Sequence, residues 1–309
     1  LKEFFNHKIT NIKGKIPSSI NGTLYRNTSV HIVRNGKSLS HWFDGDGAIL
    51  KLTITNGEAF ASYKYVQTES LKVENKLNKY IYPTLGDLPS NFFDKWRLPF
   101  HPANKANTSV LPLDDKLLAL WEGGMPYSLD LNTLETIGID NLKGLKFNET
   151  YTAHPKIDPD TGEIYNIGII NGKKGVNVYK SSKNGNIVKT KYIESTKYYP
   201  LMIHDMCIAG DYLVYIIFPT NIDLLSLLFR TKPLNDIINW DYNGYNEIII
   251  LDKKELNVVK KIKIDQFFFY HFSNGYVDNN GNLIIDLVKH TGSEMFTVFP
   301  KLITKGELN

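Results

Sequence analysis

Short segments rich in β-branched and aromatic residues recur along the chain and predict β-strands. They do not alternate with long amphipathic helices, so the pattern argues against a parallel α/β sheet. The predicted strands are Ile49–Ile54, Ala59–Val66, Lys116–Trp121, Glu163–Ile170, Tyr212–Phe218, Glu247–Leu251 and Asn282–Val288.

Residue pairs that favour tight turns punctuate these segments. Asn-Gly and Asp-Gly supply the positive φ angles that hairpin turns require. Short strands joined by such turns predict an all-β fold, either a sandwich or a propeller. The pairs are Asn35-Gly36, Asp44-Gly45, Asp46-Gly47, Asn56-Gly57, Asn171-Gly172, Asn184-Gly185 and Asn280-Gly281.

Two stretches interrupt the strand pattern. Leu85–Pro102 is rich in Pro, Phe and Trp and predicts a long loop. Ile222–Trp240 is apolar, with Arg230 and Lys232 interleaved. This second stretch has two interpretations: a short helix packed on the core, or a surface element that dips into a membrane interface and gives peripheral membrane association.

Composition narrows the class of protein. Hydrophobic residues make up 42% of the 309 residues and charged residues 22%, which is typical of a globular chain with a substantial core. The net charge of +4 comes from 36 basic and 32 acidic residues mixed along the chain, which gives no reason to propose a nucleic-acid partner. The single cysteine, Cys207, excludes an internal disulfide and predicts a reducing, cytoplasmic compartment. Its apolar neighbours predict a buried strand thiol.

Three histidines stand in distinctive local sequences: His154 in Thr-Ala-His-Pro, His204 in Ile-His-Asp-Met and His271 in Tyr-His-Phe-Ser. The intervals between them are 50 and 67 residues. The first is close to the period of about 40–50 residues that marks one propeller blade, and the second leaves room for an insertion. One imidazole per blade, directed at a central axis, would build a metal site of neutral nitrogen ligands, which suits iron, zinc or copper.

The segments around these histidines resemble those of the carotenoid cleavage oxygenase family, the retinal pigment epithelial membrane protein-like proteins. Further blocks that resemble the family follow in the same order from about Gly14 to Val288. The combination looks most like bacterial, particularly cyanobacterial, apocarotenoid oxygenases. The blocks are Gly22–Asn27, His41–Gly47, Ala106–Thr108, Leu118–Tyr127, Thr133–Thr136 and Asp158–Glu163.

The resemblance implies a seven-bladed β-propeller with one non-haem Fe(II) on its axis, held by four histidines. His154, His204 and His271 match three of these ligands. The fourth family histidine has no counterpart in this chain, and His290 lacks the expected local motif and is not assigned.

Two carboxylates are related to these histidines. Glu122 matches a position of the family pattern, and Asp205 is a sequence neighbour of His204. Glu122, in Trp-Glu-Gly-Gly, matches a family glutamate that accepts a hydrogen bond from a metal-bound histidine; its alternative is an ordinary surface carboxylate. Asp205 follows His204 directly. In a strand its side chain would face away from the metal, so we expect it to hydrogen-bond neighbouring backbone and not to be a ligand.

The remaining histidines and an acidic pair have simpler interpretations. The Asp-Gly-Asp-Gly segment lacks the other carboxylates of a calcium loop, so we expect Asp44 and Asp46 to form turns and caps. His41 is expected to be structural, and the surface or loop histidines are expected to be His7, His31 and His101.

The chain is short for the family and would supply about four to five of the seven blades. A propeller closes on itself to remove exposed sheet edges, so an open arc predicts a fragment of a longer protein. We therefore expect residues 1–309 to form a single oxygenase propeller domain that is incomplete at its C-terminus. Leu1 in place of Met suggests that the N-terminus is incomplete too.

The family cleaves a carbon–carbon double bond of a polyene or stilbene with O2 to give two carbonyl products. The resemblance therefore implies an Fe(II)-dependent dioxygenase for an apolar polyene, with cleavage of an apocarotenal to retinal as the first expectation. Tyr127, Phe269 and Phe272 are candidates for the substrate tunnel. Two alternatives stay open: a lignostilbene-type dioxygenase, and an inactive propeller fragment that acts only as a binding module.

Overall fold

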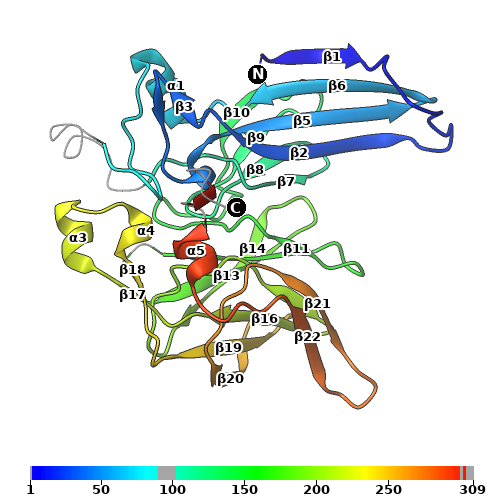
Figure 1. Ribbon diagram of the computed structural model, residues 1–309. Helices are drawn as coiled ribbons and strands as arrows, with labels where there is room; N and C mark the ends of the chain where they lie inside the picture. The colour runs from blue at the N-terminus through cyan, green and yellow to red at the C-terminus, as the bar shows by residue number, and fades with distance from the viewer. Residues whose placement is uncertain (1, 90–101, 171, 300–301, 304–309) are drawn as a thin grey trace.

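The computed structural model describes residues 2–89, 102–170, 172–299 and 302–303. Most of their regular structure is antiparallel β-sheet, which confirms the predicted all-β class (Figure 1). The predicted loop Leu85–Pro102 lies largely outside the described residues, and His101 lies outside them altogether.

Successive groups of strands build sheets that we number as blades. Blade 1 contains β1 (Phe4–Lys8), β2 (Gly22–Val30), β5 (Asp46–Thr55) and β6 (Glu58–Tyr65). Blade 2 contains β7 (Ser109–Pro112), β8 (Leu117–Leu120), β9 (Tyr127–Leu129) and β10 (Thr136–Ile139). Blade 3 contains β11 (Lys156–Ile157), β12 (Ile164–Ile169), β13 (Gly175–Ser181) and β14 (Ile187–Glu194). Blade 4 contains β15 (Cys207–Ala209), β16 (Tyr212–Ile217), β19 (Tyr245–Asp252) and β20 (Val258–Asp265), and blade 5 contains β21 (Phe272–Val277) and β22 (Leu283–Leu287).

Blades 2 and 3 are simple meanders, in which each strand pairs with the next one along the chain. Blade 1 has the order β1-β6-β5-β2, and blade 4 has the order β15-β16-β19-β20 because an insertion separates β16 from β19. The blades follow one another along an arc from blade 1 at the top of Figure 1 to β21 and β22 below. The described residues form four complete blades and two strands of a fifth. This agrees with the predicted four to five blades.

Short elements fill the connections between these strands. The insertion in blade 4 corresponds to the apolar stretch Ile222–Trp240 and contains two short helices in place of the single helix expected. The short elements are β3 (Val33–Arg34), β4 (Lys37–Ser38), η1 (Trp42–Asp44), α1 (Glu69–Leu77), β17 (Thr220–Ile222), α3 (Leu224–Phe229), α4 (Leu234–Ile237), β18 (Ile238–Trp240) and α5 (Glu294–Thr297).

Hydrophobic cores lie between neighbouring blades. Tyr165 of blade 3 and Leu213 of blade 4 belong to one buried cluster, and Ile49 of blade 1 and Leu129 of blade 2 belong to another. A central strand such as β16 is buried on both faces, whereas the edge strand β14 alternates between exposed and half-buried positions. This sandwiching explains why strands such as β8 and β16 are continuously apolar.

The predicted turn chemistry is found in part: Asn35-Gly36 lies between β3 and β4, whereas Asp46-Gly47 lies inside β5 and forms no turn. Asn56 and Gly57 join β5 to β6 with φ angles of 51° and 78°, the left-handed conformation that this tight hairpin requires. Cys207 lies buried in β15, as predicted, and burial raises the pKa of its thiol to about 12, so the thiolate is scarce at neutral pH.

The prediction that Asp44 and Asp46 serve local turns and caps is wrong. Asp44 accepts hydrogen bonds from the backbone N–H groups of Leu85 and Gly86, 2.9 and 2.8 Å away. Asp46 pairs with Lys105 at 3.1 Å, fully inside the protein. Both carboxylates therefore hold segments that are distant in sequence, because burial leaves them no water to bind.

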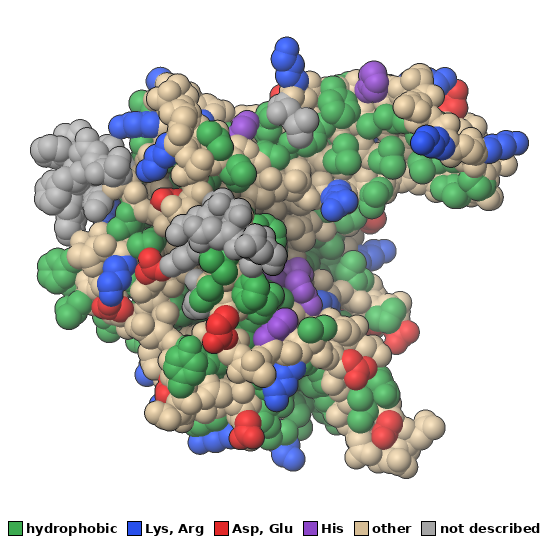
Figure 2. Space-filling model, in the orientation of Figure 1, with side chains coloured by type: hydrophobic (Ala, Val, Ile, Leu, Met, Phe, Trp, Pro, Cys, Tyr) green, Lys and Arg blue, Asp and Glu red, His purple; other side chains and the backbone are tan. Residues whose placement is uncertain are grey.

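The outer shape leaves a hollow between the blade 1 side and the blade 5 side of the arc, and histidine side chains are visible beside it in Figure 2. None of the helices in the described residues has both the length and the apolar character that crossing a membrane requires.

Candidate metal centre

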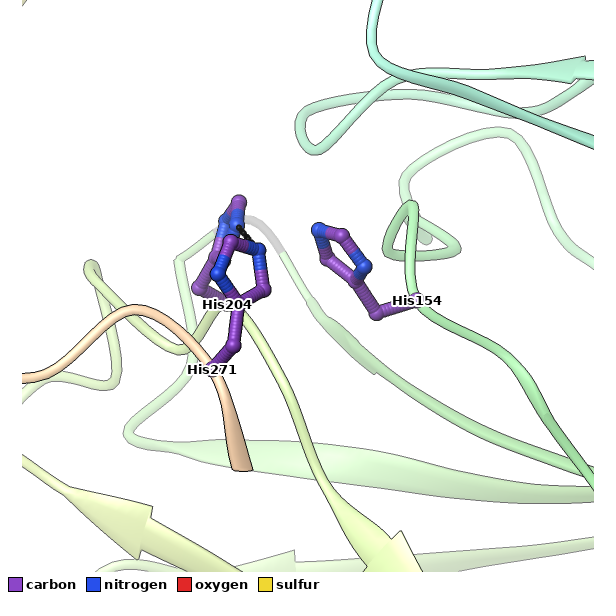
Figure 3. Close-up of side chains that lie close together, drawn as sticks. All are labelled: His154, His204 and His271. Carbon is purple, nitrogen blue, oxygen red and sulfur yellow. Dashed lines mark hydrogen bonds between the residues drawn. The ribbon is translucent and has the colours of Figure 1, made fainter. Parts of the chain in front are cut away.

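The three predicted histidines occupy equivalent places in three successive blades. His154 precedes β11, His204 precedes β15 and His271 precedes β21, so each stands just before the first strand of its blade. One ring nitrogen of each lies within 4.8 Å of the others (Figure 3). The structure thus brings together side chains that are 50 and 67 residues apart.

The spacing of the rings suits a shared cation. The Nε2 atoms of His204 and His271 are 3.1 Å apart, and the ring centre of His154 lies 4.3 Å from that of His204. Two nitrogens bound to one ion at about 2.1 Å lie roughly 3.0–3.4 Å apart at right or tetrahedral angles. The Nε2 atom of His154 is buried and has no hydrogen-bond partner among the described residues, and a metal would satisfy it.

Glu122 lies beside this cluster, on the segment that follows β8. Its Oε1 atom is 3.3 Å from Nδ1 of His204 and also accepts the backbone N–H of Ala153, next to His154, at 3.3 Å. A carboxylate at Nδ1 keeps the proton on that nitrogen and leaves the Nε2 lone pair directed at the cluster. Glu122 is therefore more than a solvated surface carboxylate.

The protonation states differ among the three imidazoles. Burial, with the positive charge of His204 adding to it, lowers the pKa of His154 to about 4. Burial and His204 likewise lower the pKa of His271. Burial alone would lower the pKa of His204, but the charge and hydrogen bond of Glu122, with the charge of Asp205, together raise the pKa above the ordinary value. Two imidazoles are thus neutral near pH 7, and a metal competes with a proton mainly at His204.

This donor set fits a transition metal. Neutral imidazoles favour iron, zinc or copper over calcium and magnesium, which prefer oxygen ligands. Across the described residues, the cluster of His, Cys, Asp and Glu side chains able to share an ion consists of these three histidines. The arrangement is compatible with a metal site in which neighbouring positions stay free for other ligands.

The other predicted site residues lie in hydrophobic cores. Tyr127 is buried between blades 1 and 2, and its hydroxyl oxygen accepts the backbone N–H of Glu69 at 3.2 Å. Phe269 and Phe272 pack against each other, with ring centres 4.7 Å apart, in the core of blades 4 and 5. Their place in a substrate tunnel stays a prediction.

Among the described residues, His7, His31 and His41 lie outside the cluster, as expected. His41 is buried, and its Nδ1 atom accepts the backbone N–H of Phe43 as the cap of η1. His7 is exposed on β1, and His31 lies 3.4 Å from the Asp46 carboxylate.

One contact near the centre had no signal in the sequence. Lys156, two residues after His154, forms an ion pair of 2.7 Å with the buried Asp205, next to His204. As expected, Asp205 is not part of the histidine cluster and accepts backbone hydrogen bonds, although it precedes β15 and does not lie in a strand. Periodicity along the chain cannot report a pair whose members come from different blades.

Comparisons with known proteins agree with this architecture. The family model described as Retinal pigment epithelial membrane protein matches residues 2–307. Apocarotenoid-15,15'-oxygenase from Synechocystis is 28% identical over 98% of this chain and 62% of the relative. Resveratrol cleavage oxygenase 1 from Aspergillus fumigatus is 31% identical over 89% of this chain and 54% of the relative.

A solved structure shows the same similarity in three dimensions. The crystal structure of cobalt-substituted Synechocystis apocarotenoid oxygenase is 27% identical and has a TM-score of 0.85. The alignment covers 94% of this chain and 62% of that one. The chain therefore spans less than two thirds of the length of these relatives.

Proposed function

Because this chain belongs to the retinal pigment epithelial membrane protein family, we propose that it is part of an Fe(II)-dependent oxygenase that cleaves a carbon–carbon double bond of a carotenoid or apocarotenoid with O2. The observation that carries the proposal is the convergence of three imidazoles beside a hydrogen-bonding carboxylate. A propeller that served only as a binding module would have no need of this arrangement. The oxygenase names of the relatives support the reaction class.

We assign Fe(II) to the centre, with His154, His204 and His271 as its ligands in this chain. Bound iron would supply the activation of O2 toward the double bond. The low pKa of His154 keeps that ligand neutral, and Glu122 orients the ring of His204. Because all three ligands are neutral, they leave the double positive charge of the ion uncompensated.

The proposed substrate is an apolar polyene, and an apocarotenal cleaved to two aldehydes, one of them retinal, is the first choice. Phe269 and Phe272 support a position for the polyene near the centre, because they lie within two residues of His271. In this proposal Tyr127, which is buried between blades 1 and 2, forms part of a supporting wall. The apolar side chains would hold the polyene and exclude water.

A lignostilbene-type dioxygenase is the alternative function. The similarity to resveratrol cleavage oxygenase 1 of Aspergillus fumigatus favours it, since resveratrol is a stilbene. Competition between all-trans apocarotenal and resveratrol in one assay separates the two functions, because the preferred substrate is consumed first.

We also propose that α3 brings the protein to a membrane surface. Its exposed side chains Leu225 and Phe229 are 69% and 58% accessible, and Arg230 and Lys232 follow them. An apolar helix face beside basic residues suits an anionic lipid interface.

The test of the proposed function is the His204→Ala variant of the 309-residue chain, loaded with Fe(II) without oxygen. The chain with His204 should retain about one iron and convert an apocarotenal to shorter aldehydes when O2 is admitted. Removing His204 should lower iron retention at least about tenfold and abolish cleavage, because a ligand and the contact of Glu122 are lost together.

Metal analysis and chromatography of the products measure both quantities, and His7→Ala is the matched control because His7 is exposed on β1. Unchanged cleavage by the His204→Ala variant would contradict the proposal. Absence of bound iron in the unaltered chain would contradict the assignment of Fe(II) to these three histidines.

A further inference from the structure

Asp205 is a buried carboxylate that the proposed metal chemistry does not use. It is 2% exposed and lies on the segment between His204 and β15. Isolated buried carboxylates are strongly unfavourable, so the partners of this one show what it stabilises.

Asp205 receives a donor from each of the three segments that carry the histidines. Its Oδ1 atom pairs with the Lys156 ammonium at 2.7 Å and accepts the backbone N–H of Met206 at 2.8 Å. Its Oδ2 atom accepts the backbone N–H of Phe272 at 3.0 Å. Lys156 comes two residues after His154, and Phe272 comes directly after His271.

These contacts restrict how the three segments can move relative to one another. Hydrogen bonds to an ionised carboxylate are shorter and stronger than those between neutral groups. With both oxygens engaged, the carboxylate of Asp205 is fixed in orientation, and so are the starts of β11, β15 and β21. A metal site tolerates errors of only about 0.2 Å in its ligand distances, so this restriction acts directly on metal binding.

Glu122 and Asp205 join different sets of blades near the metal centre. Glu122 contacts the His204 ring and the backbone beside His154, and so joins blades 2, 3 and 4. Asp205 touches none of the three rings by a hydrogen bond in the structure and joins blades 3, 4 and 5 through the backbone and Lys156. The backbone between blades 4 and 5 near the centre is thus held by Asp205.

We propose that Asp205 is a positioning residue for the metal centre: together with Lys156 it sets the spacing of His154, His204 and His271 by joining the segments that carry them. This role rests on the proposed metal site. Asp205 would act on the three histidine ligands through the main chain that carries them.

Titration with Co(II) tests this role, because its visible d–d absorption reports coordination geometry as well as affinity. Asp205→Asn keeps the size of the side chain but removes the ion pair with Lys156. We expect the Co(II) dissociation constant to rise about tenfold or more, and the d–d spectrum to change in shape. Lys156→Met, which leaves the backbone hydrogen bonds of Asp205 in place, should give a smaller change in the same direction, and Lys156→Arg should restore binding.

The matched control is Lys253→Met. Lys253 pairs at 2.6 Å with Asp158, another carboxylate that is 1% exposed, and this pair also links blades 3 and 4. The control should lower the melting temperature without altering Co(II) affinity or spectrum, which separates general destabilisation from positioning. If Asp205→Asn does not fold, the comparison of Lys156→Met with Lys156→Arg tests the positioning role.

Co(II) binding by Asp205→Asn and Lys156→Met with the affinity and spectrum of the unaltered chain would overturn the positioning role alone. Failure of the unaltered chain to bind Co(II) would overturn the proposed metal site and this role with it. A change equal to that of Lys253→Met would show that Asp205 is merely structural and would also overturn the inference.

Discussion

At the scale of single residues, the centre depends on how carboxylates and imidazoles share protons. His154 is kept neutral by burial, whereas Glu122 raises the pKa of His204 in spite of burial. A metal must displace the proton from a histidine before it can bind. The proton on His204 is therefore the principal competitor of the metal as the pH falls below neutrality.

Glu122→Gln should change both the strength and the pH dependence of metal binding. An amide does not stabilise the imidazolium form, so the pKa of His204 should fall. Binding of Co(II) should then persist to lower pH than in the unaltered chain, while the affinity at pH 8 drops about tenfold because the ring is less well oriented.

Co(II) titrations between pH 5.5 and 8 measure both effects. Glu135→Gln serves as the control, since Glu135 is an exposed carboxylate that pairs with Lys64 away from the centre. An unchanged pH midpoint in Glu122→Gln would show that Glu122 does not govern the proton on His204.

At the scale of elements, the insertion between β16 and β19 combines an anchored helix with an exposed one. In α4, Ile237 is 1% exposed and the Asn235 N–H donates to the Leu85 carbonyl at 2.9 Å. In α3, Leu225 and Leu228 are 69% and 56% exposed. A globular protein rarely gathers such side chains on its surface without a partner, and a lipid interface is the partner we propose for α3.

The double substitution Leu225→Glu and Leu228→Glu should weaken binding to anionic phospholipid vesicles at least about tenfold, because two charges cannot enter the apolar layer. Vesicle co-sedimentation measures this, and circular dichroism checks the fold. The matched control places Glu at Ile137 and Val188, which are 68% and 62% exposed on blades 2 and 3. Equal loss in both double variants would refute a specific role of α3.

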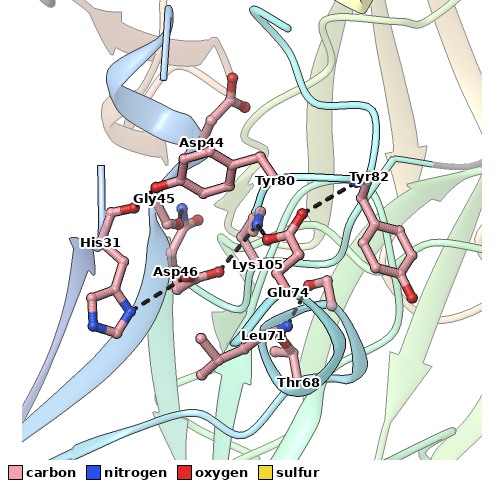
Figure 4. Close-up of polar contacts among 12 residues, drawn as sticks. His31, Asp44, Gly45, Asp46, Thr68, Leu71, Glu74, Tyr80, Tyr82 and Lys105 are labelled. Atoms are coloured by element: carbon pink, nitrogen blue, oxygen red, sulfur yellow. Dashed lines mark hydrogen bonds and ion pairs between the residues drawn. The ribbon is translucent and has the colours of Figure 1, made fainter. Parts of the chain in front are cut away.

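At the scale of the whole molecule, buried ion pairs link neighbouring blades and the segments that connect them. Lys105, on the segment that leads into blade 2, contacts Asp46 of blade 1 at 3.1 Å and Glu74 of α1 at 3.3 Å. Figure 4 shows the ammonium group between the two carboxylates. Glu74 also accepts the backbone N–H of Ile81 at 3.0 Å, so the loss of Lys105 would affect several segments together.

Lys105→Met should lower the free energy of unfolding by about 3–5 kcal/mol, since it leaves the buried Glu74 carboxylate without its cation and Asp46 with Arg34 as its remaining buried cation. Lys8→Met should change it by less than about 1 kcal/mol, because Lys8 and Glu58 form a half-exposed pair on blade 1. Urea denaturation measures both changes. Equal effects would mean that water reaches the Lys105 site.

The predicted strands include some that are buried on both faces, such as β8 and β16, and some that are partly exposed, such as β22. All seven predicted segments coincide with observed strands, among them Tyr212–Phe218 with β16 and Glu163–Ile170 with β12. In edge strands such as β14 and β20, Lys residues interrupt the apolar positions, and these strands gave weaker signals. The helix α1 was missed because it is mostly polar and Leu71 is its one fully buried apolar side chain.

The sequence by itself determined the all-β class and the three histidines, because these depend on composition and on local patterns of residues; the blade count and the role of Glu122 came from the resemblance to the family. Tertiary structure alone decided which charges meet. Asp46 and Lys105 are 59 residues apart, and Asp205 and Phe272 are 67 apart. Local periodicity reports which face of a strand is buried, whereas the partner of a buried carboxylate depends on how whole blades pack. The residues that hold the proposed metal were therefore readable from the chain, and the residues that hold those ligands in place were not.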